Sequence, residues 1–364
     1  MNTTYLNNNQ KTVLQASRGV AACLVLLFHV SAMSFKYFQY DLLGISTIGR
    51  SGGLDFFFVL TGFLLYSTYG KNIGTRMPIM PFLTNRLIRI YPFYWVITLL
   101  VLPVYFLVPS FGVGFETNKA AIILSLLLLP QAHGPIVPVA WSLSYFVLFY
   151  LLFSLIMALG KKPALIFASL WMTLTLCHVC NVPLIGADID RHFYLSFLFS
   201  EVNLEFALGC LLAKWAQYHP SRQYKLFLFA GALGFVCLWL NNKYLILPYH
   251  DYLLYAIPAT LVLLGAVSVP EKLHLPFSVQ TLGKLGNASY TILLTHLLFI
   301  SVLMKLSKAT HFASKIGYLW IDVLIVICTI PLCYLVYTFA EKRLVMFIKQ
   351  AIKLHPSKSP KPVS

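Results

Sequence analysis

Charged side chains are scarce in this chain, and acidic side chains are the scarcest. The 364 residues include 27 Lys+Arg and 11 Asp+Glu, so charged residues make up 10% of the chain, against about a quarter in soluble domains. Hydrophobic residues make up 59%, which leaves too little polar surface to face water. The composition excludes a typical soluble enzyme and predicts an integral membrane protein.

The excess of basic residues gives a net charge of +16, which could indicate a polyanion such as nucleic acid as a partner. Most of these residues, however, lie in short polar breaks between apolar runs. Basic residues at such places orient transmembrane helices, because they are retained on the cytosolic side. We therefore interpret the charge as a topology signal and expect no nucleic-acid partner.

Several common signals are also missing. The seven cysteines lie in apolar stretches, where they pack rather than form a disulfide framework. Cys177, His178 and Cys180 have no second ligand pair at a matching spacing, so no metal site is expected. No small-residue cleavage site follows the first apolar run, so no cleavable signal peptide is expected. A nucleophile elbow, a phosphate-binding glycine loop and a dinucleotide fingerprint are absent too.

The apolar runs predict an all-α, polytopic helical bundle. A spanning helix needs about 20 largely apolar residues, and the runs of that length lie near 16–35, 52–70, 92–111, 140–160, 163–182, 193–213, 226–242, 251–269, 286–304 and 317–339. An eleventh run, 120–130, is too short to cross and ends in turn-forming residues, so we expect it to be re-entrant or interfacial. We expect about ten transmembrane helices in one domain, residues 1–340, without a soluble domain.

An even number of crossings places both termini on the same side, and the positive-inside rule makes that side the cytosol. The basic breaks assigned to the cytosol contain Lys71, Arg76, Arg86 and Arg89, then Lys161 and Lys162, then Lys214, Arg222 and Lys225, then Lys272 and Lys284. One conflict remains, because the plan places Lys305, Lys308 and Lys315 outside. The tail, 341–364, alternates lysines with apolar residues and is expected to lie as an amphipathic helix in the inner interface.

Ionisable residues inside a span are costly and are functional candidates by default. The first predicted helix carries Arg18 and His29, which are eleven positions apart. Eleven steps of about 100° bring them onto one face, about 16 Å apart along the axis. A lone histidine of this kind is usually a neutral side chain bonded to a backbone carbonyl. The aligned Arg18 favours a functional role, with Arg18 at the cytosolic entrance and His29 deep in the membrane.

Other polar residues extend this candidate site. Asp55 lies near the outer end of the second predicted helix, where it could orient an imidazole or simply cap the helix. Arg86 and Arg89 are one turn apart and suit phosphate, although anchoring at the cytosolic surface is an equal alternative. His296 lies mid-span and is a candidate for another wall of the same cavity. The remaining acidic residues in spans are Glu201, Glu205, Asp322 and Glu341.

A set of landmarks covers nearly the whole chain. They are Arg18 with His29, the segment 53–63 (GLDFFFVLTGF), the segment 86–92 (RLIRIYP), Trp141-Ser142-Leu143, Phe149-Tyr150, Ser289-Tyr290 with His296, and Glu341-Lys342. In order and spacing they resemble acyltransferase family 3, membrane O-acyltransferases that in bacteria modify surface polysaccharides, lipopolysaccharide and peptidoglycan. One departure is Phe146, at a position where the family usually has a glutamate.

The resemblance implies a multi-pass enzyme of the bacterial inner membrane. It would move an acyl group, most often acetyl, from cytosolic acyl-CoA to a hydroxyl of an extracytoplasmic or lipid-linked glycan, such as exopolysaccharide, O-antigen or lipopolysaccharide. Acyl-CoA would be a substrate, and no tightly bound cofactor or metal is expected. The residues and the resemblance together assign catalysis to His29, Asp55 and Arg18, donor binding to Arg86, Arg89 and Tyr91, and substrate binding to His296, Trp141 and Ser142.

Two mechanisms and two other protein classes stay open at this point. His29 could act as a general base for the attacking hydroxyl or could form an acyl-imidazole first. A proton-coupled transporter or lipid flippase would also bury ionisable residues, but the paired repeats with broken helices of many transporters are not evident. A polyprenyl-phosphate glycosyltransferase would normally carry a larger external region than 112–139.

Overall fold

The computed structural model describes residues 6–46, 50–76, 78–180, 182, 192–218, 221–244 and 252–351. Its helices confirm the all-α prediction, and a single isolated bridge joins Thr75 to Gly160 within these residues. The α-helices are α1 (Asn8–Phe38), α2 (Gly53–Tyr69), α3 (Ile79–Leu107), α4 (Lys119–Leu126), α5 (Trp141–Ala158), α6 (Lys161–Val179), α7 (Phe193–Leu198), α8 (Val202–Tyr218), α9 (Tyr224–Tyr244), α10 (Ala256–Val267), α11 (Phe277–Asn287), α12 (Ser289–Ala309), α13 (Phe312–Ile316), α14 (Tyr318–Val336) and α15 (Lys342–Ala351).

Helical turns of other types join these elements. The 3₁₀ turns are η1 (Leu42–Gly44), η2 (Gly70–Asn72), η3 (Pro109–Phe111), η4 (Phe115–Thr117), η5 (Pro138–Ala140) and η7 (Tyr252–Tyr255). A π-helical turn, η8 (Tyr337–Glu341), lies between α14 and α15. Such wide turns often occur at functional sites, and this one positions Glu341, which is discussed below.

Eight helical stretches of the described part are long and apolar enough to cross a membrane, where the sequence predicts about ten. The other two expected spans are also helical but shorter: α2 has 17 residues, and α10 belongs to the apolar stretch Leu253–Val267. The helix α2 is short because it begins inside the bundle. A Cβ atom on Gly53 would lie 2.4 Å from the carbonyl oxygen of Ala21, so α2 begins beside the middle of α1 rather than at its end.

Two other boundaries differ from the sequence prediction. The helix α3 begins at Ile79, well before the predicted 92, and therefore includes Arg86 and Arg89. Pro81 is tolerated because it lies in the first turn, where a backbone N–H has no intrahelical acceptor. The expected span 193–213 is interrupted between α7 and α8. The first turn of α8 therefore lies inside the bundle, and so do the polar side chains that it carries.

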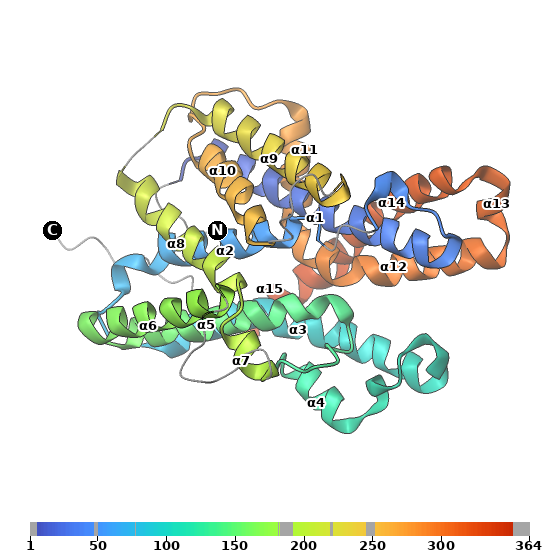
Figure 1. Ribbon diagram of the computed structural model, residues 1–364, viewed down its shortest axis with the longest axis horizontal. Coiled ribbons are helices and arrows are strands. Elements are labelled where there is room, and N and C mark those ends of the chain that lie inside the picture. Colours follow the sequence, from blue (N-terminus) through green and yellow to red (C-terminus); the bar gives the residue numbers. More distant parts are fainter. Residues whose placement is uncertain are drawn as a thin grey trace.

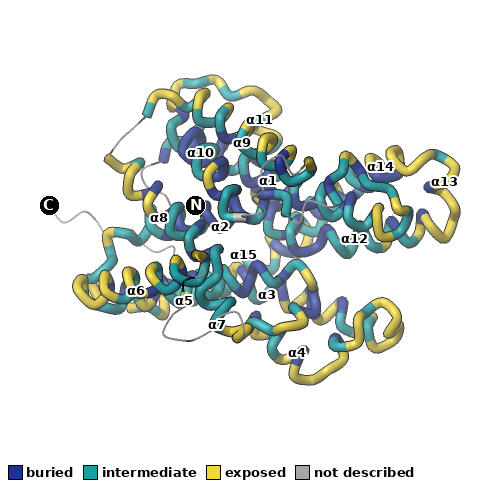
Figure 2. Tube along the Cα trace, in the orientation of Figure 1, coloured by how far each residue is buried: buried dark blue, intermediate teal, exposed yellow. Residues whose placement is uncertain are grey.

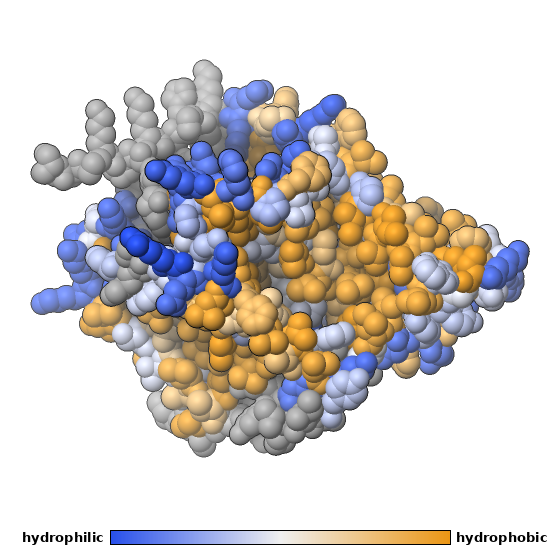
Figure 3. Space-filling model, turned by 90° about the horizontal axis from the view of Figure 1, so that it is seen from above, coloured by the Kyte–Doolittle hydropathy of each residue, from blue (hydrophilic) through white to orange (hydrophobic). Residues whose placement is uncertain are grey.

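The helix α1 forms the centre of the molecule (Figures 1 and 2), and α2, α10, α11, α12 and α14 all pack against it. Of the apolar window of α1, 56% is buried, against 11% for α9. The peripheral helices α6 and α9 therefore present most of their apolar side chains outward, as lipid-facing helices do. Figure 3 shows apolar side chains over the middle of one face, with hydrophilic ones gathered toward its two ends.

The short apolar run predicted to be re-entrant or interfacial contains α4, which has eight residues. Its last carbonyl groups accept hydrogen bonds from three side chains of α3. Tyr91 Oη donates to Leu127 O at 2.8 Å, Tyr94 Oη to Ser125 O at 2.7 Å, and Trp95 Nε1 to Leu126 O at 2.8 Å. Carbonyl groups at the end of a helix need such partners where water is excluded, so α3 holds the short helix in place.

The loop before α4 is organised around Glu116. Burial of this carboxyl opposes its ionisation, but the backbone N–H groups of Val113 and Gly114 donate to it and lower its pKa. Both carboxyl oxygens lie within 3.1 Å of Val113 N, and one is 2.8 Å from Gly114 N. The ionised carboxylate therefore closes this loop.

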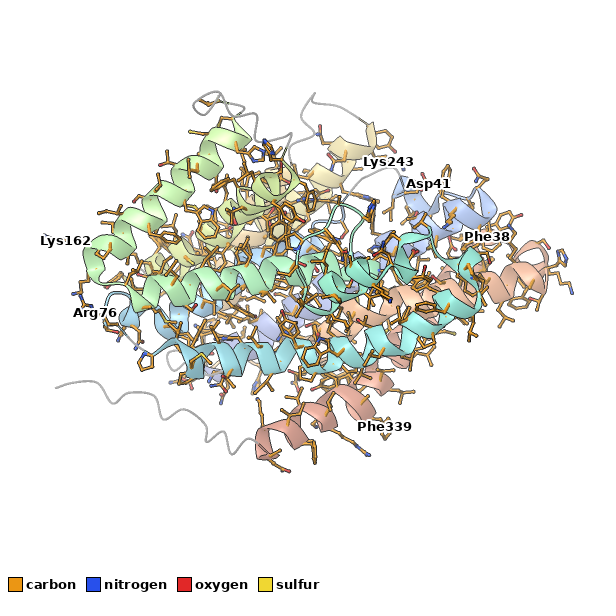
Figure 4. The ribbon with its side chains drawn as sticks, turned by 90° about the horizontal axis from the view of Figure 1, so that it is seen from below. Phe38, Asp41, Arg76, Lys162, Lys243 and Phe339 are labelled. Carbon is orange, nitrogen blue, oxygen red and sulfur yellow. The ribbon has the colours of Figure 1, made fainter. Side chains whose placement is uncertain are left out.

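The two ends of the bundle can be told apart by their residues. In Figure 4, Arg76 and Lys162 lie at one end, whereas Phe38, Asp41 and Lys243 lie toward the other. Lys243 Nζ donates to Leu43 O at 2.9 Å, which ties α9 to the connection after α1. The positive-inside rule assigns the first end to the cytosol. Both termini in the cytosol stays a prediction.

The predicted tail begins as a helix. Residues Lys342–Ala351 form α15 and pack against α3, while 352–364 lie outside the described residues. The expected division at residue 340 therefore falls inside η8, and a cytosolic interfacial role for the tail stays a prediction.

Candidate functional site

Two histidines from different helices meet in the middle of the bundle. Nε2 of His296, on α12, lies 3.1 Å from Nδ1 of His29, on α1, and the ring centroids are 4.8 Å apart. His296 is fully buried, whereas His29 is partly exposed. The pair therefore has one fully buried histidine and one partly exposed histidine.

The carbonyl partners of the two rings define their tautomers. Nδ1 of His29 lies 2.8 Å from Val25 O, and Nδ1 of His296 lies 2.7 Å from Ile292 O. A carbonyl oxygen only accepts hydrogen bonds, so each Nδ1 carries a proton when its ring is neutral. The Nδ1–H of His29 can then also be shared with Nε2 of His296. This leaves the lone pair of His29 on Nε2, in the correct form for a general base.

Arg18 lies toward the other end of α1 and is buried. Its Nη1 donates to Gln15 Oε1 and its Nη2 to Ser289 Oγ, both at 2.8 Å. The charges of Arg89 and Glu341 act on this guanidinium, so Arg89 lies within electrostatic range of Arg18. Arg18 and His29 are therefore linked to α12 by two polar contacts, to Ser289 and to His296.

Glu341 joins this cluster because of the π-helical turn. Its carboxylate accepts a hydrogen bond from Thr291 Oγ1, and it is buried. Its negative charge interacts with both Arg18 and Arg89. The cluster of Arg18, Arg89, Thr291 and Glu341 is a polar region between the predicted cytosolic end and the histidine pair.

Asp55 was expected either to orient the imidazole of His29 or to cap its helix, and in the structure it contacts Arg50 instead of His29. Its Oδ1 lies 3.3 Å from Nη1 of Arg50. Arg50 also contacts Glu201 at 2.9 Å and Glu205 at 3.8 Å, both near the start of α8. Asp55 and Glu205 are almost completely buried. The side chain that lies within hydrogen-bond distance of the His29 ring is His296, so the orienting group in this structure is a histidine.

Trp141 and Ser142 belong to an aromatic region next to this carboxylate cluster. The rings of Trp141 and Tyr145 both pack against Phe58 of α2, with centroids 6.2 and 6.0 Å away. Ser142 Oγ donates to the carbonyl of the preceding turn, Val139 O, at 3.0 Å. Phe146, at the position where the resemblance implies a glutamate, packs on the same Phe58 ring at 5.2 Å.

The three residues expected to bind the donor have different surroundings. The guanidinium of Arg86 lies over the rings of Tyr69, Phe82 and Tyr150, at 5.4 to 5.9 Å from their centroids. Arg89 is exposed, and it is near Arg18 as described above. Tyr91 supports α4 through its hydroxyl group. Of these three, Arg89 is therefore best placed to meet a soluble anion.

Sequence reasoning missed several members of these clusters. Arg50 was not singled out, although the buried carboxylates Asp55 and Glu205 require a cation and Arg50 lies five residues before the first of them. Gln15 shares a face of α1 with Arg18, which a helical wheel would have shown. Thr291 has no distinguishing signal, because a threonine in a span is common. In the described part of the chain, no group of three or more metal-binding side chains is arranged around a possible ion.

Comparison with known proteins gives consistent results. A family model described as an acyltransferase domain, of the acyltransferase 3 type, matches residues 13–338. The chain is also 28% identical, over 302 residues, to the exopolysaccharide production protein ExoZ of Rhizobium meliloti (strain 1021), covering 78% of this chain and 84% of that protein. No solved structure matches the chain.

Proposed function

Because the chain belongs to the acyltransferase 3 family and is therefore a membrane acyltransferase, we propose that it acylates a hydroxyl group of an exopolysaccharide. The donor is cytosolic acyl-CoA, most simply acetyl-CoA, and the enzyme resides in the bacterial inner membrane. The acceptor approaches from the extracytoplasmic side, free or lipid-linked. The relative ExoZ, named for exopolysaccharide production, supports this class of acceptor over lipopolysaccharide.

The observation that carries the proposal is the position and pairing of His29. It lies about 16 Å along α1 from Arg18, and its ring is partly exposed and held by Val25 and His296. Arg18 and Arg89 supply positive charge on the cytosolic side of it, which suits the phosphates of acyl-CoA. A donor and an acceptor that enter from opposite ends can therefore meet at His29.

In the proposed reaction, Nε2 of His29 accepts the proton of the acceptor hydroxyl as its oxygen attacks the thioester carbonyl. The new C–O ester bond forms, the C–S bond breaks, and the departing thiolate takes the proton from the imidazolium. While His29 is charged, its Nδ1–H is stabilised by Val25 O and by Nε2 of His296. This support resembles that of the carboxylate in a catalytic triad, but with a neutral partner.

The first test is mass spectrometry of surface glycans from cells that express the wild type or His29→Ala at matched membrane levels. We expect an added acyl mass with the wild type and a rate about 10²–10⁴-fold lower for the variant, which is the usual contribution of a general base. The control is His133→Ala, which removes an exposed imidazole that stacks on Phe115 in the outer connection. Full modification by His29→Ala would refute the proposal.

The same material separates direct transfer from an acyl-enzyme. Purified protein is incubated with acyl-CoA in the absence of acceptor, and peptides that contain His29 are analysed by mass spectrometry. Direct transfer predicts unmodified His29, because the imidazole only moves a proton. An acyl group on this histidine would instead indicate covalent catalysis.

A further inference from the structure

A polar groove of about 510 Å³ lies at the predicted cytosolic end of α1. It is bounded by the first turns of α1, by α11 and by the segment 273–275, which leads into α11. Its lining includes Asn9, Lys11, Gln15, His274, Lys284 and Asn287. None of the residues assigned to the proposed reaction lines this groove.

The walls of the groove are fixed to each other. Asn9 Nδ2 donates to the carbonyl groups of Pro270, Glu271 and Leu273, at 3.0, 2.8 and 2.7 Å. On the other side, a Cβ atom on Gly286 of α11 would lie 1.8 Å from Gln15 O, so α1 and α11 are in backbone contact. The groove is therefore a preformed feature, as small-molecule sites usually are.

The groove connects to the buried arginine. Gln15 lines the groove and also accepts the 2.8 Å hydrogen bond from Nη1 of Arg18. The guanidinium of Arg18 is buried, and its Nε has no hydrogen-bond partner among the described residues. A ligand phosphate deep in the groove would lie near a buried cation with an unsatisfied donor, which favours an anionic occupant.

The groove and His29 also share one face of α1. Lys11 and His29 are eighteen residues apart, and eighteen steps of about 100° make five complete turns. Arg18 lies on the same line, within about 20°. The distance along the axis from Gln15 to His29 is about 21 Å. This separation suits a ligand with a charged head at the groove and a long flexible arm that ends at the imidazole.

We propose that this groove binds the phosphorylated adenosine of acyl-CoA, with Lys11 and Lys284 facing its 3′-phosphate and Asn287 facing the base. The pantetheine arm then passes Arg18 and presents the thioester to His29. The inference rests on the proposed function, because it names the binding site of that donor. Lysine and amide side chains around one groove suit phosphate and purine groups. Lysines that only anchor a helix at the cytosolic surface need not line a groove.

The test measures binding of acetyl-CoA to full-length protein in phosphatidylcholine nanodiscs by isothermal titration calorimetry. We compare the wild type with Lys11→Ala, Lys284→Ala and Lys225→Ala. Lys225 is the control, since it is an exposed lysine in α9, outside the lining of the groove. Each groove variant should bind acetyl-CoA at least about tenfold more weakly, as expected when a charge-assisted hydrogen bond to phosphate is lost.

Two further ligands identify which part of the donor the groove holds. Dephospho-CoA, which lacks the 3′-phosphate, should bind the wild type more weakly and should lose less affinity in the groove variants. S-acetylpantetheine, which lacks the nucleotide, should be used with the same KM and kcat by the wild type and both groove variants. A raised KM for this short donor in the variants would mean that the lysines act through the fold, and would overturn the assignment.

The outcomes separate the two proposals. If the wild type binds acetyl-CoA and the groove variants bind it equally well, the groove assignment is wrong and the proposed function stands. If the wild type does not bind acetyl-CoA, both fail together. If phosphatidylglycerol in the nanodisc competes with acetyl-CoA in the wild type but not in Lys284→Ala, the groove is a lipid-headgroup site, and the assignment is overturned.

Discussion

At the scale of single residues, three ionisable groups inside the bundle have partners on other segments of the chain. His29 contacts His296, Arg18 contacts Ser289, and Asp55 contacts Arg50. An isolated charge in a bilayer is costly, so each contact lowers the cost of keeping a reactive group there. The histidine pair differs from the others, because both members can be neutral and one remains accessible.

This pairing predicts the effect of replacing His296. In His296→Asn, the ring nitrogen that accepts a hydrogen bond from Nδ1–H of His29 is lost, and the shorter amide side chain does not reach the same position. The imidazolium of His29 therefore keeps one of its two hydrogen-bond acceptors, Val25 O. We expect kcat to fall on the order of tenfold or more, by less than for His29→Ala, because the base itself remains. The KM for acyl-CoA should not change.

The measurement is a steady-state assay with acyl-CoA at several concentrations in detergent-solubilised enzyme. The matched control is His178→Asn, whose Nδ1 also lies near a carbonyl oxygen, that of Phe199, but on α6. A His296→Asn enzyme with unchanged kcat would mean that His296 only fills space.

At this scale the sequence predicted the residues better than their partners. Arg18 and His29 were found because helical periodicity relates residues on one helix. The partners Ser289, Thr291 and Arg50 lie on other segments, and their roles depend on which helices become neighbours. Periodicity carries no information about that choice, and Asp55 was consequently expected at His29 rather than at Arg50.

At the scale of elements, the contact between α2 and α8 depends on two glycines. A Cβ atom on Gly62 would lie 1.9 Å from Phe206 O, and one on Gly209 would lie 1.9 Å from Val59 O. Small residues allow helices in membranes to approach this closely. The close contact brings the first turn of α8, with Glu205, beside the first turn of α2, with Asp55.

The variant Gly62→Ala should therefore separate the two helices. We expect it to lower the free energy of unfolding by about 1–3 kcal/mol, the usual cost of overpacking, which thermal unfolding followed by tryptophan fluorescence would measure. Gly160→Ala is the control, since a Cβ atom there meets only ordinary contacts at 3.8 Å or more. Equal stability of both variants would show that the backbones can move apart without loss.

Element types were predictable from hydrophobicity, but several boundaries were not. The length rule located the apolar runs, and the short run at α4 was recognised because its length excludes a crossing. The early start of α3 was missed because Arg86 and Arg89 were assigned to a polar break, although both lie inside the helix. The break between α7 and α8 was missed because both halves are apolar. In the structure, the break places Glu201 and Glu205 in contact with Arg50.

At the scale of the whole molecule, α1 joins the two ends. It runs from the polar groove to the connection that contains Asp41, and it carries Lys11, Arg18 and His29 along one face. The basic residues Arg76 and Lys162 mark one end of the bundle, and Lys243 lies toward the other (Figure 4). A reaction between a cytosolic donor and an external acceptor requires that the first end faces the cytosol.

This orientation can be tested with single cysteines. Lys162 is exposed at the predicted cytosolic end, and Lys315 is exposed on α13 at the predicted outer end. The variants Lys162→Cys and Lys315→Cys are made in a chain whose exposed native cysteines, Cys180 and Cys237, are replaced by serine. A membrane-impermeant maleimide should label position 315 in intact spheroplasts, and position 162 only after the membrane is permeabilised.

The result matters because Lys315, with Lys305 and Lys308, violates the positive-inside rule in this plan. The reverse labelling pattern would invert the molecule, place the groove at Lys11 and Lys284 outside the cell, and remove acyl-CoA as the donor.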